Sequence, residues 1–188
     1  MQPRFCPQCA SPLARQTPKD GEPERLVCPA CGHVHYMDPK LAAGCIVEHQ
    51  GGIVLVRRGI EPGYGKWVYP GGYVDRGETV EEAARRETQE EACLEVRVGP
   101  LVGLYSYPGQ TVIVAVYRGT VTGGTLRAAD ECLEARPFTP QAIPWSELAF
   151  PSTFDALRDY VAQAHALAPP ASAQPPTFPS PSTPHHVG

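Results

Sequence analysis

The feature that most constrains this chain is an acidic helix in the middle of the sequence. Residues 79–93 are predicted to be helical, because Thr79 and Glu82 have the Thr-x-x-Glu spacing of a capping box. Three carboxylates stand at positions i, i+3 and i+4 of this helix and share one face: Glu87, Glu90 and Glu91. These side chains repel one another, so the fold must expose them to water or give them a cation.

Both outcomes are physically reasonable for a charged helical face. Exposure to water is the usual one and suits the glutamates of the first turn. Clustered oxygen ligands are also what Mg²⁺ and Mn²⁺ select, and a divalent cation would turn the repulsion into binding. Arg86 lies one turn from Glu90 and can orient a carboxylate without displacing a metal. Gly71 and Gly72 are expected to form a tight turn that aims a backbone carbonyl at the same ion.

These residues resemble the Nudix box, G-x5-E-x7-R-E-U-x-E-E-x-G-U, in which U is aliphatic. The matching positions are Gly72, Glu78, Arg86, Glu87, Glu90, Glu91 and Leu94. Two positions depart from the pattern, since Thr88 replaces an aliphatic residue and Cys93 replaces the glycine that ends the helix. That end often needs a left-handed residue, so a side chain there is expected to cost about 1 kcal/mol. The departures leave the metal ligands in place.

Two cysteine pairs near the N-terminus form a second constellation. Their spacing is C-x2-C-x18-C-x2-C, within the range of zinc sites, and the residues are Cys6, Cys9, Cys28 and Cys31. Two residues between cysteines let one tight turn aim both thiolates at a single point. A segment of about 35 residues has too little core to fold alone, so a metal would supply its folding free energy. We therefore predict a structural Zn²⁺ with four thiolate ligands, in preference to two disulfides or a redox motif.

Composition divides the chain into three parts. We expect a zinc ribbon over 1–37, a catalytic domain over 38–166 and a disordered proline-rich tail over 167–188. Apolar segments in the middle part predict strands over 41–48, 52–57, 95–98, 101–107, 111–118 and 134–138. Further helices are predicted over 145–148 and 152–164. This pattern predicts an α/β fold in which a mixed sheet is packed between helices.

Charge and cysteine content restrict the location and the partners. The net charge of −4 disfavours a general nucleic-acid-binding protein, although a local basic patch stays possible. The apolar runs are too short to span a membrane, and the N-terminus has no secretory signal. An odd number of cysteines, seven, argues against a disulfide framework. We expect a cytoplasmic protein that has no membrane partner.

A four-cysteine ribbon followed by a Nudix domain resembles the FAD- and ADP-ribose-hydrolysing Nudix enzymes related to the plant chloroplast FAD pyrophosphatase. Besides the box, the similar segments are residues 38–40, 67–73 and 148–152. The resemblance implies hydrolysis of a nucleoside diphosphate linked to another moiety, such as FAD or ADP-ribose. The products would be a nucleoside monophosphate and the phosphorylated second moiety. NADH pyrophosphatases also carry a ribbon, but residues 102–108 lack their SQPWPFPxS motif.

The resemblance also implies roles for individual residues. Two or three Mg²⁺ or Mn²⁺ ions would be held by the Gly71 carbonyl and the carboxylates of Glu87, Glu90 and Glu91. Arg86, together with Glu78, would brace that shell. The general base would be a box glutamate or Glu131, which stands in the loop before the last strand. The substrate would be a small nucleotide, and the family commonly forms homodimers.

Several alternatives stay open from the sequence alone. The domain could sense nucleotides without hydrolysing them, although such domains typically lose a box glutamate. It could also act on capped RNA ends. Stacking on a base or contact with phosphate is possible for a set of residues that could equally belong to the core or the surface: Trp67, Tyr69, Tyr105, Tyr107, Arg57, Arg58 and Lys66.

Overall fold

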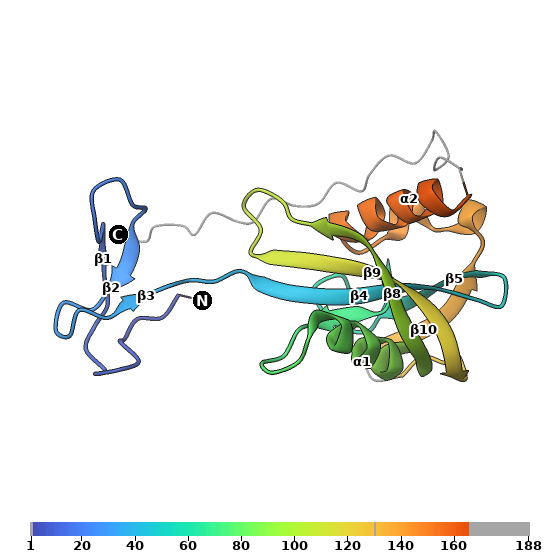
Figure 1. The fold of residues 1–188 in the computed structure, drawn as a ribbon, viewed down its shortest axis with the longest axis horizontal. Coiled ribbons are helices and arrows are strands. Elements are labelled where there is room, and N and C mark those ends of the chain that lie inside the picture. The colour runs from blue at the N-terminus through green and yellow to red at the C-terminus, as the bar shows by residue number, and fades with distance from the viewer. Residues whose placement is uncertain (1, 130, 166–188) are drawn as a thin grey trace. The chain divides into compact units, whose positions relative to one another are not determined.

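The computed structural model describes residues 2–129 and 131–165 (Figure 1). It divides into two compact units, Met1–Pro39 and Lys40–Gly188, and each unit has a sheet of its own. The proline-rich tail predicted over 167–188 lies outside the described residues. None of the helices in the described residues has the length and apolar character needed to cross a membrane.

Two matching turns and a small antiparallel sheet build the N-terminal unit. The strands lie in the order β1 (Ala14–Gln16), β2 (Arg25–Val27) and β3 (Val34–His35). In the first turn the Ala10 N–H donates to the Cys6 carbonyl at 2.9 Å, and in the second the Gly32 N–H donates to the Cys28 carbonyl at 2.9 Å. Ala10 and Gly32 each follow the second cysteine of a pair, and their φ angles are 59° and 74°. The two turns therefore present their cysteines in the same way.

The second unit is built on a mixed sheet, as predicted. Its strands are β4 (Lys40–His49), β5 (Gly52–Arg58), β6 (Trp67–Val68), β7 (Gly71–Tyr73), β8 (Leu94–Tyr105), β9 (Val112–Gly124) and β10 (Cys132–Phe138). They lie in the order β10-β5-β4-β9-β8, with β6 paired to β5 and β7 paired to β4. The β4–β9 pair is parallel and the other pairs are antiparallel.

Two helices, α1 (Val80–Ala92) and α2 (Pro151–His165), cover opposite faces of this sheet (Figure 1). Successive side chains of a strand point to opposite faces. Accordingly, Ile46 packs in the same buried cluster as Leu157 of α2, whereas Val47 packs in the cluster of Ala84 of α1. Burial on both faces explains why the central strands are continuous apolar runs. The predicted α/β fold class is confirmed.

Several elements differ in extent from the prediction. The strands predicted over 95–98 and 101–107 form the single strand β8, because its pairing with β9 continues through irregularities on either side of Leu101. β9 runs on to Gly124 instead of ending at Arg118. The helix predicted over 145–148 is a single 3₁₀ turn at Trp145–Glu147, which follows another at Pro140–Ala142. Short 3₁₀ turns are common connectors, and the sequence pattern does not separate them from α-helix.

Both ends of α1 have the predicted chemistry. The Thr79 hydroxyl accepts a hydrogen bond from the Glu82 N–H at 3.2 Å, and the Glu82 carboxylate accepts one from the Thr79 N–H at 2.7 Å. At the other end, Cys93 has φ 54° and ψ 31°, and its N–H donates to the Gln89 carbonyl. Cys93 thus adopts the left-handed conformation that a glycine usually supplies. Thr88 is fully buried, and its hydroxyl donates to the Ala84 carbonyl at 2.7 Å, which makes a polar residue acceptable there.

Removing the Thr79 cap should destabilise the second unit measurably. We expect Thr79→Ala to lower the free energy of unfolding by about 1 kcal/mol, because two N–H groups at the start of α1 lose or weaken their bonds. Thr139→Ala is the matched control, since Thr139 precedes a 3₁₀ turn without a side-chain cap bond. Urea denaturation of both variants is the measurement. Equal losses in the two variants would contradict the role of the cap.

Candidate active site

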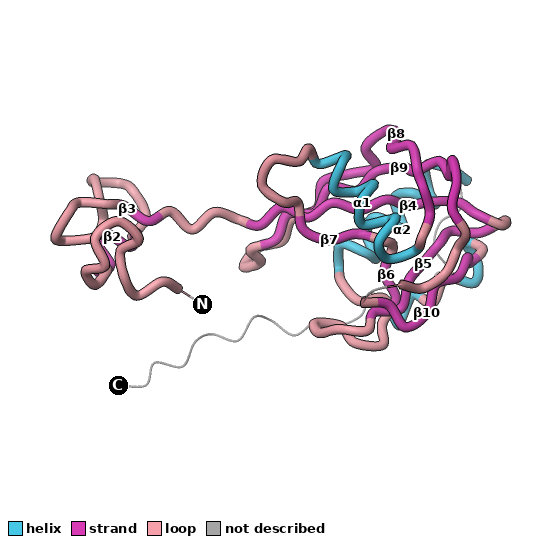
Figure 2. The backbone as a smooth tube through the Cα atoms, turned by 90° about the horizontal axis from the view of Figure 1, so that it is seen from below, coloured by secondary structure: helices cyan, strands magenta, loops and turns pink. Residues whose placement is uncertain are grey.

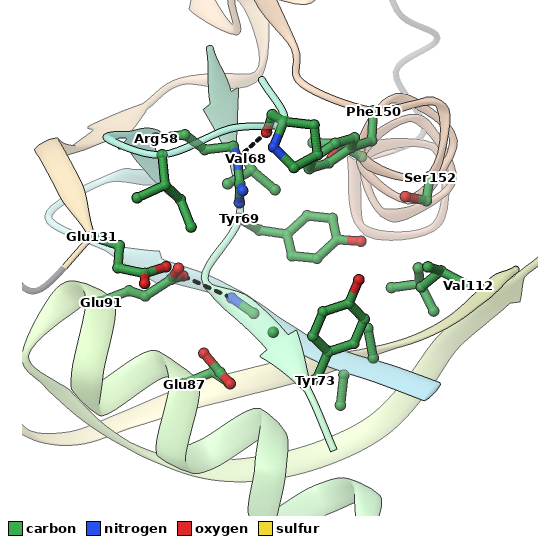
Figure 3. Close-up of a pocket in the computed structure, with 18 of the residues that line it drawn as sticks. Arg58, Val68, Tyr69, Tyr73, Glu87, Glu91, Val112, Glu131, Phe150 and Ser152 are labelled. Carbon is green, nitrogen blue, oxygen red and sulfur yellow. Dashed lines mark hydrogen bonds between the residues drawn. The ribbon is translucent and has the colours of Figure 1, made fainter. Parts of the chain in front are cut away.

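A cavity of about 510 Å³ opens in the second unit, and it is lined from several elements (Figure 3). Its volume suits a small-molecule ligand. One part carries carboxylates, from Glu87 and Glu91 of α1 and from Glu131 in the loop before β10. Another part is rich in aromatic side chains. The cavity therefore offers an acidic region and an apolar region to one ligand.

The acidic region depends on close contact between α1 and β7, which runs beside both α1 and β4 (Figure 2). A Cβ added at Gly72 would overlap the Glu87 carboxyl group, and one added at Gly71 would lie 2.7 Å from the Ala43 carbonyl oxygen. The Gly71 N–H donates to the Glu91 carboxylate at 2.9 Å. The expectation of a tight turn at Gly71 and Gly72 is wrong. Both lie in a strand without positive φ, and they are glycines because neighbouring groups approach their Cα atoms closely.

The carboxylates that line the cavity are unfavourable as a set of negative charges, and Glu91 is the buried one among them. Burial raises the pKa of Glu91 to about 7, and the nearby charges of Glu87 and Glu131 act in the same direction. Burial also raises the pKa of Glu87, against the opposing effect of Arg86. Figure 3 shows the Glu131 and Glu91 side chains directed toward each other. A site of this kind favours either protonation or a bound cation.

Arg86 organises the carboxylates from one side. It donates to both oxygens of Glu78 at 2.7 and 3.1 Å, to Glu87 at 2.8 Å and to Glu90 at 3.0 Å. It also donates to the Tyr73 carbonyl at 3.0 Å, which fastens α1 to β7. Arg86 therefore links three carboxylates to β7, and its role in bracing a metal shell stays a prediction.

Glu90 is placed differently from the other two box glutamates. It is half-exposed and bound to Arg86, and it does not line the cavity. The helical geometry explains the difference, because residues i and i+4 are separated by about 40° around the axis, whereas i and i+3 are separated by about 60° in the other direction. Among the described residues, the cysteines form the one group of three or more potential ligands within 4.8 Å of each other. The carboxylates line the cavity without forming so tight a cluster.

The position of Glu131 is fixed by the end of β5. Its carbonyl oxygen accepts a hydrogen bond from the Gly59 N–H at 2.6 Å. A Cβ on Gly59 would lie 2.7 Å from that same oxygen, so the glycine permits the contact. Glu131 is exposed to solvent at the cavity, in contrast to the buried Glu91. A residue from a distant loop is thereby brought to the face of α1.

Arg58 is the basic residue that the structure selects from the candidates on β5 and in the following loop. It lines the cavity, its Nε donates to the Pro62 carbonyl at 2.8 Å, and its guanidinium lies over the Phe150 ring at 5.1 Å. Arg57 instead donates to the Gly65 carbonyl, and neither Arg57 nor Lys66 lines the cavity. Adjacent strand residues point in opposite directions, which separates Arg57 from Arg58.

The predicted aromatic candidates also divide into residues that line the cavity and residues that do not. Tyr69 and Tyr107 line the cavity, whereas Trp67 and Tyr105 belong to the buried core and do not. Sequence reasoning missed two cavity aromatics, Tyr73 and Phe150. Tyr73 is 51% exposed and has the Lys40 ammonium 4.6 Å from its ring centre. Both stood in segments used for the family resemblance, but only the fold shows that they face the ligand space.

The four cysteines meet in the N-terminal unit. The Sγ atoms are 3.6 Å apart for Cys6 and Cys31, 3.4 Å for Cys9 and Cys28, and 3.5 Å for Cys9 and Cys31. Sulfur atoms around a tetrahedral metal bound at about 2.3 Å would be about 3.8 Å apart. The thiols are free, and all four Sγ atoms lie within 4.8 Å of one another. This geometry fits one tetrahedral metal ion whose ligands are all protein thiolates.

Comparison with known proteins agrees with both units. The NUDIX domain family model matches residues 38–160, and the Nudix N-terminal zinc ribbon model matches residues 4–37. The ADP-ribose pyrophosphatase of Methanocaldococcus jannaschii is 40% identical over 119 residues, which cover 61% of this chain and 69% of that protein. The NAD-capped RNA hydrolase NudC of Chromobacterium violaceum is 32% identical over 150 residues, which cover 75% of this chain and 52% of that protein.

Solved structures give the same result. The crystal structure of a NUDIX hydrolase from Nitrosomonas europaea superimposes with a TM-score of 0.81 at 33% identity, covering 93% of this chain and 96% of that chain. This chain spans about half the length of the NAD-capped RNA hydrolases that it matches. With a family model that covers the cavity and all its carboxylates, the chain belongs to the Nudix family.

Proposed function

We propose that the protein is a metal-dependent pyrophosphohydrolase that splits the diphosphate of a nucleoside diphosphate linked to a second moiety. ADP-ribose and FAD represent the substrate class. The observation that carries this proposal is the cavity itself, which places carboxylates, two arginines (Arg58 and Arg86) and aromatic side chains around a single space. A diphosphate needs cations, and an attached base needs an apolar wall. The two regions of the cavity meet both needs.

The carboxylates would hold the divalent ions. Glu87 and Glu91 line the cavity, Glu131 faces Glu91, and Glu90 and the Gly71 carbonyl are the further ligands that we propose. These residues suit such ions because Mg²⁺ and Mn²⁺ prefer oxygen ligands. A bound cation would also reduce the repulsion between Glu87 and Glu91, whose pKa values are raised. Two or three such ions would neutralise the diphosphate and lower the pKa of the attacking water.

Protein groups would carry the remaining steps. Glu131 is our candidate for the general base, because it is exposed to the cavity, where it can accept a proton from water. The Arg58 guanidinium would bind a phosphate oxygen, since only its Nε has a backbone partner and its charge lies near Glu91. Tyr69, Tyr73 and Tyr107 would form the wall for the base or the flavin ring.

Hydrolysis can be tested with a substrate panel and two matched arginine variants. We expect Mg²⁺- or Mn²⁺-dependent release of monophosphates from ADP-ribose or FAD, and loss of this activity in Glu91→Gln. Arg58→Ala should lower kcat/KM about 10- to 100-fold, because a charge-assisted contact with phosphate is lost. Arg57→Ala, next to it but outside the cavity, is the control and should have little effect. Chromatography of the products is the measurement.

Two results would contradict this account. Absence of turnover for the whole panel, with the protein folded and both metals supplied, would favour a nucleotide-sensing domain. Equal losses in the Arg57 and Arg58 variants would remove Arg58 from the phosphate site while leaving the hydrolase proposal standing.

Capped RNA ends are the second candidate substrate. It is favoured by the similarity to NAD-capped RNA hydrolases over three quarters of the chain. The N-terminal unit has basic residues that could contact RNA, but Arg15 already pairs with Glu24 at 3.5 Å, and Asp20 and Glu22 offset further charge. We therefore place small nucleotides first. RNA affinity that falls steeply with salt would reverse that order.

We infer that the metal of the cysteine site is Zn²⁺ and that it is structural. Four thiolates would leave no open position for catalysis, and zinc binds thiolates in this geometry. The site requires reduced thiols, which supports a cytoplasmic location.

Removal of the zinc should unfold the N-terminal unit alone. We expect about one zinc per chain by elemental analysis. A strong chelator should abolish the dispersed amide NMR signals of residues 2–39, because that unit depends on the metal, while the signals of the second unit persist. Cys28→Ser should lose the zinc, whereas Cys132→Ser, outside the cluster, should retain it. Retained dispersion after chelation would show that the metal does not hold this unit together.

We also infer a homodimer. β8 is at the edge of the sheet, and its Leu101 and Leu104 side chains are 52% and 62% exposed. Apolar residues on an edge strand are a hazard for aggregation unless another surface covers them. A second copy of the chain would provide that cover, and light scattering should give twice the chain mass. A monomer mass at working concentrations would contradict this.

A further inference from the structure

Two tyrosine–aspartate pairs connect the end of β8 to α2. The Tyr105 hydroxyl donates to Asp159 at 3.1 Å, and the Tyr107 hydroxyl donates to Asp155 at 2.6 Å. Arg158 binds both carboxylates, Asp155 at 2.7 Å and Asp159 at 3.0 Å. The pairs therefore have the same chemistry, the same helix and the same shared arginine.

The pairs differ in what fixes each tyrosine. Tyr105 is the last residue of β8 and is paired with Val114 of β9, so the sheet holds its backbone. Tyr107 lies in the connection between β8 and β9, where its carbonyl accepts a turn hydrogen bond from the Gln110 N–H. The side-chain bond to Asp155 is thus its direct link to α2. Burial and the neighbouring Asp155 raise the pKa of Tyr107, so its hydroxyl stays protonated and can donate.

The pairs also differ in their relation to the cavity. Tyr107 lines it, together with Gln110 and Val112 at the aromatic end. Tyr105 is buried in the core and does not line it. The hydrogen bond from Tyr107 to Asp155 therefore fixes a side chain that lines the cavity. The equivalent bond from Tyr105 to Asp159 fixes a side chain of the core.

We propose that Asp155 is a positioning residue that holds the Tyr107 ring as a wall of the cavity and so sets the affinity for the aromatic ring of the substrate. The inference rests on the proposed function. Asp155 need not touch the substrate, because it acts through the Tyr107 hydroxyl. Binding against a ring that is already ordered costs less free energy than binding that must first order the ring. The effect falls on the binding of substrate and transition state alike, so it changes KM and leaves kcat in place.

Steady-state kinetics on ADP-ribose with a double-mutant cycle tests this. Tyr107→Phe and Asp155→Ala should each raise KM about three- to tenfold, the scale of one hydrogen bond, with kcat nearly unchanged. The double variant should be no worse than the more affected single variant, because both changes remove the same bond. Tyr105→Phe and Asp159→Ala are the matched controls and should leave KM unchanged. Asp155→Ala and Asp159→Ala each remove one partner of Arg158, so their melting temperatures should fall alike.

A second readout separates this inference from the hydrolase proposal. Calorimetry of AMP binding should show weaker affinity in Tyr107→Phe and Asp155→Ala, and wild-type affinity in the two controls. If the wild-type protein hydrolyses ADP-ribose but Asp155→Ala and Asp159→Ala change KM equally, the positioning role is overturned and the proposed function stands. AMP binding that depends on Asp155, without hydrolysis of any substrate, would overturn the function alone. Absence of both binding and hydrolysis would overturn both.

Discussion

The site depends on one close contact, in which two carboxylates of α1 lie against a strand that has no side chains at that point. Gly72 leaves room for the Glu87 carboxyl group, and Gly71 donates its N–H to Glu91. The contact removes both carboxylates largely from water, and burial is the largest cause of the raised pKa of each. Like charges in such a place destabilise the folded state until a cation or a proton joins them.

The rest of the unit offsets this cost. Arg86 donates hydrogen bonds to three carboxylates and to the Tyr73 carbonyl, so it fastens α1 to β7. Its positive charge is paired with these carboxylates. Apolar clusters on both faces of the sheet anchor α1 on one side and α2 on the other. The carboxylates therefore have little freedom to move apart. This is the arrangement of a site that is preorganised for a ligand at the expense of stability.

Local features were predictable from the sequence. The capping box of α1, the left-handed Cys93 and the common face of Glu87 and Glu91 follow from spacings of three and four residues. The two cysteine turns follow from spacings within each pair, although their meeting at one point is a property of the folded unit. The mixed sheet followed from apolar runs alternating with helices, and the Nudix fold from the box.

Features that depend on long-range contacts were not predictable. Neither the box nor the composition could show that Arg58, and not Arg57, lines the cavity. The difference depends on which face of β5 each residue occupies. The glycines at 71 and 72 suggested a turn, whereas their true constraint is the approach of β4 and of the Glu87 side chain. The two strands predicted on either side of Leu101 form the single strand β8 because both segments pair with β9. In each case a partner distant in the chain decides.

Thermal unfolding of wild type and Glu91→Gln, with and without Mg²⁺, tests the central claim most directly. If repulsion among buried carboxylates is the price of the metal site, Glu91→Gln should melt at a higher temperature than wild type without the cation. Saturating Mg²⁺ should stabilise wild type by about 3 kcal/mol at a hundredfold excess over the dissociation constant, and should affect the variant little. A variant that melts lower without Mg²⁺, or that gains as much from Mg²⁺ as wild type, would contradict the account.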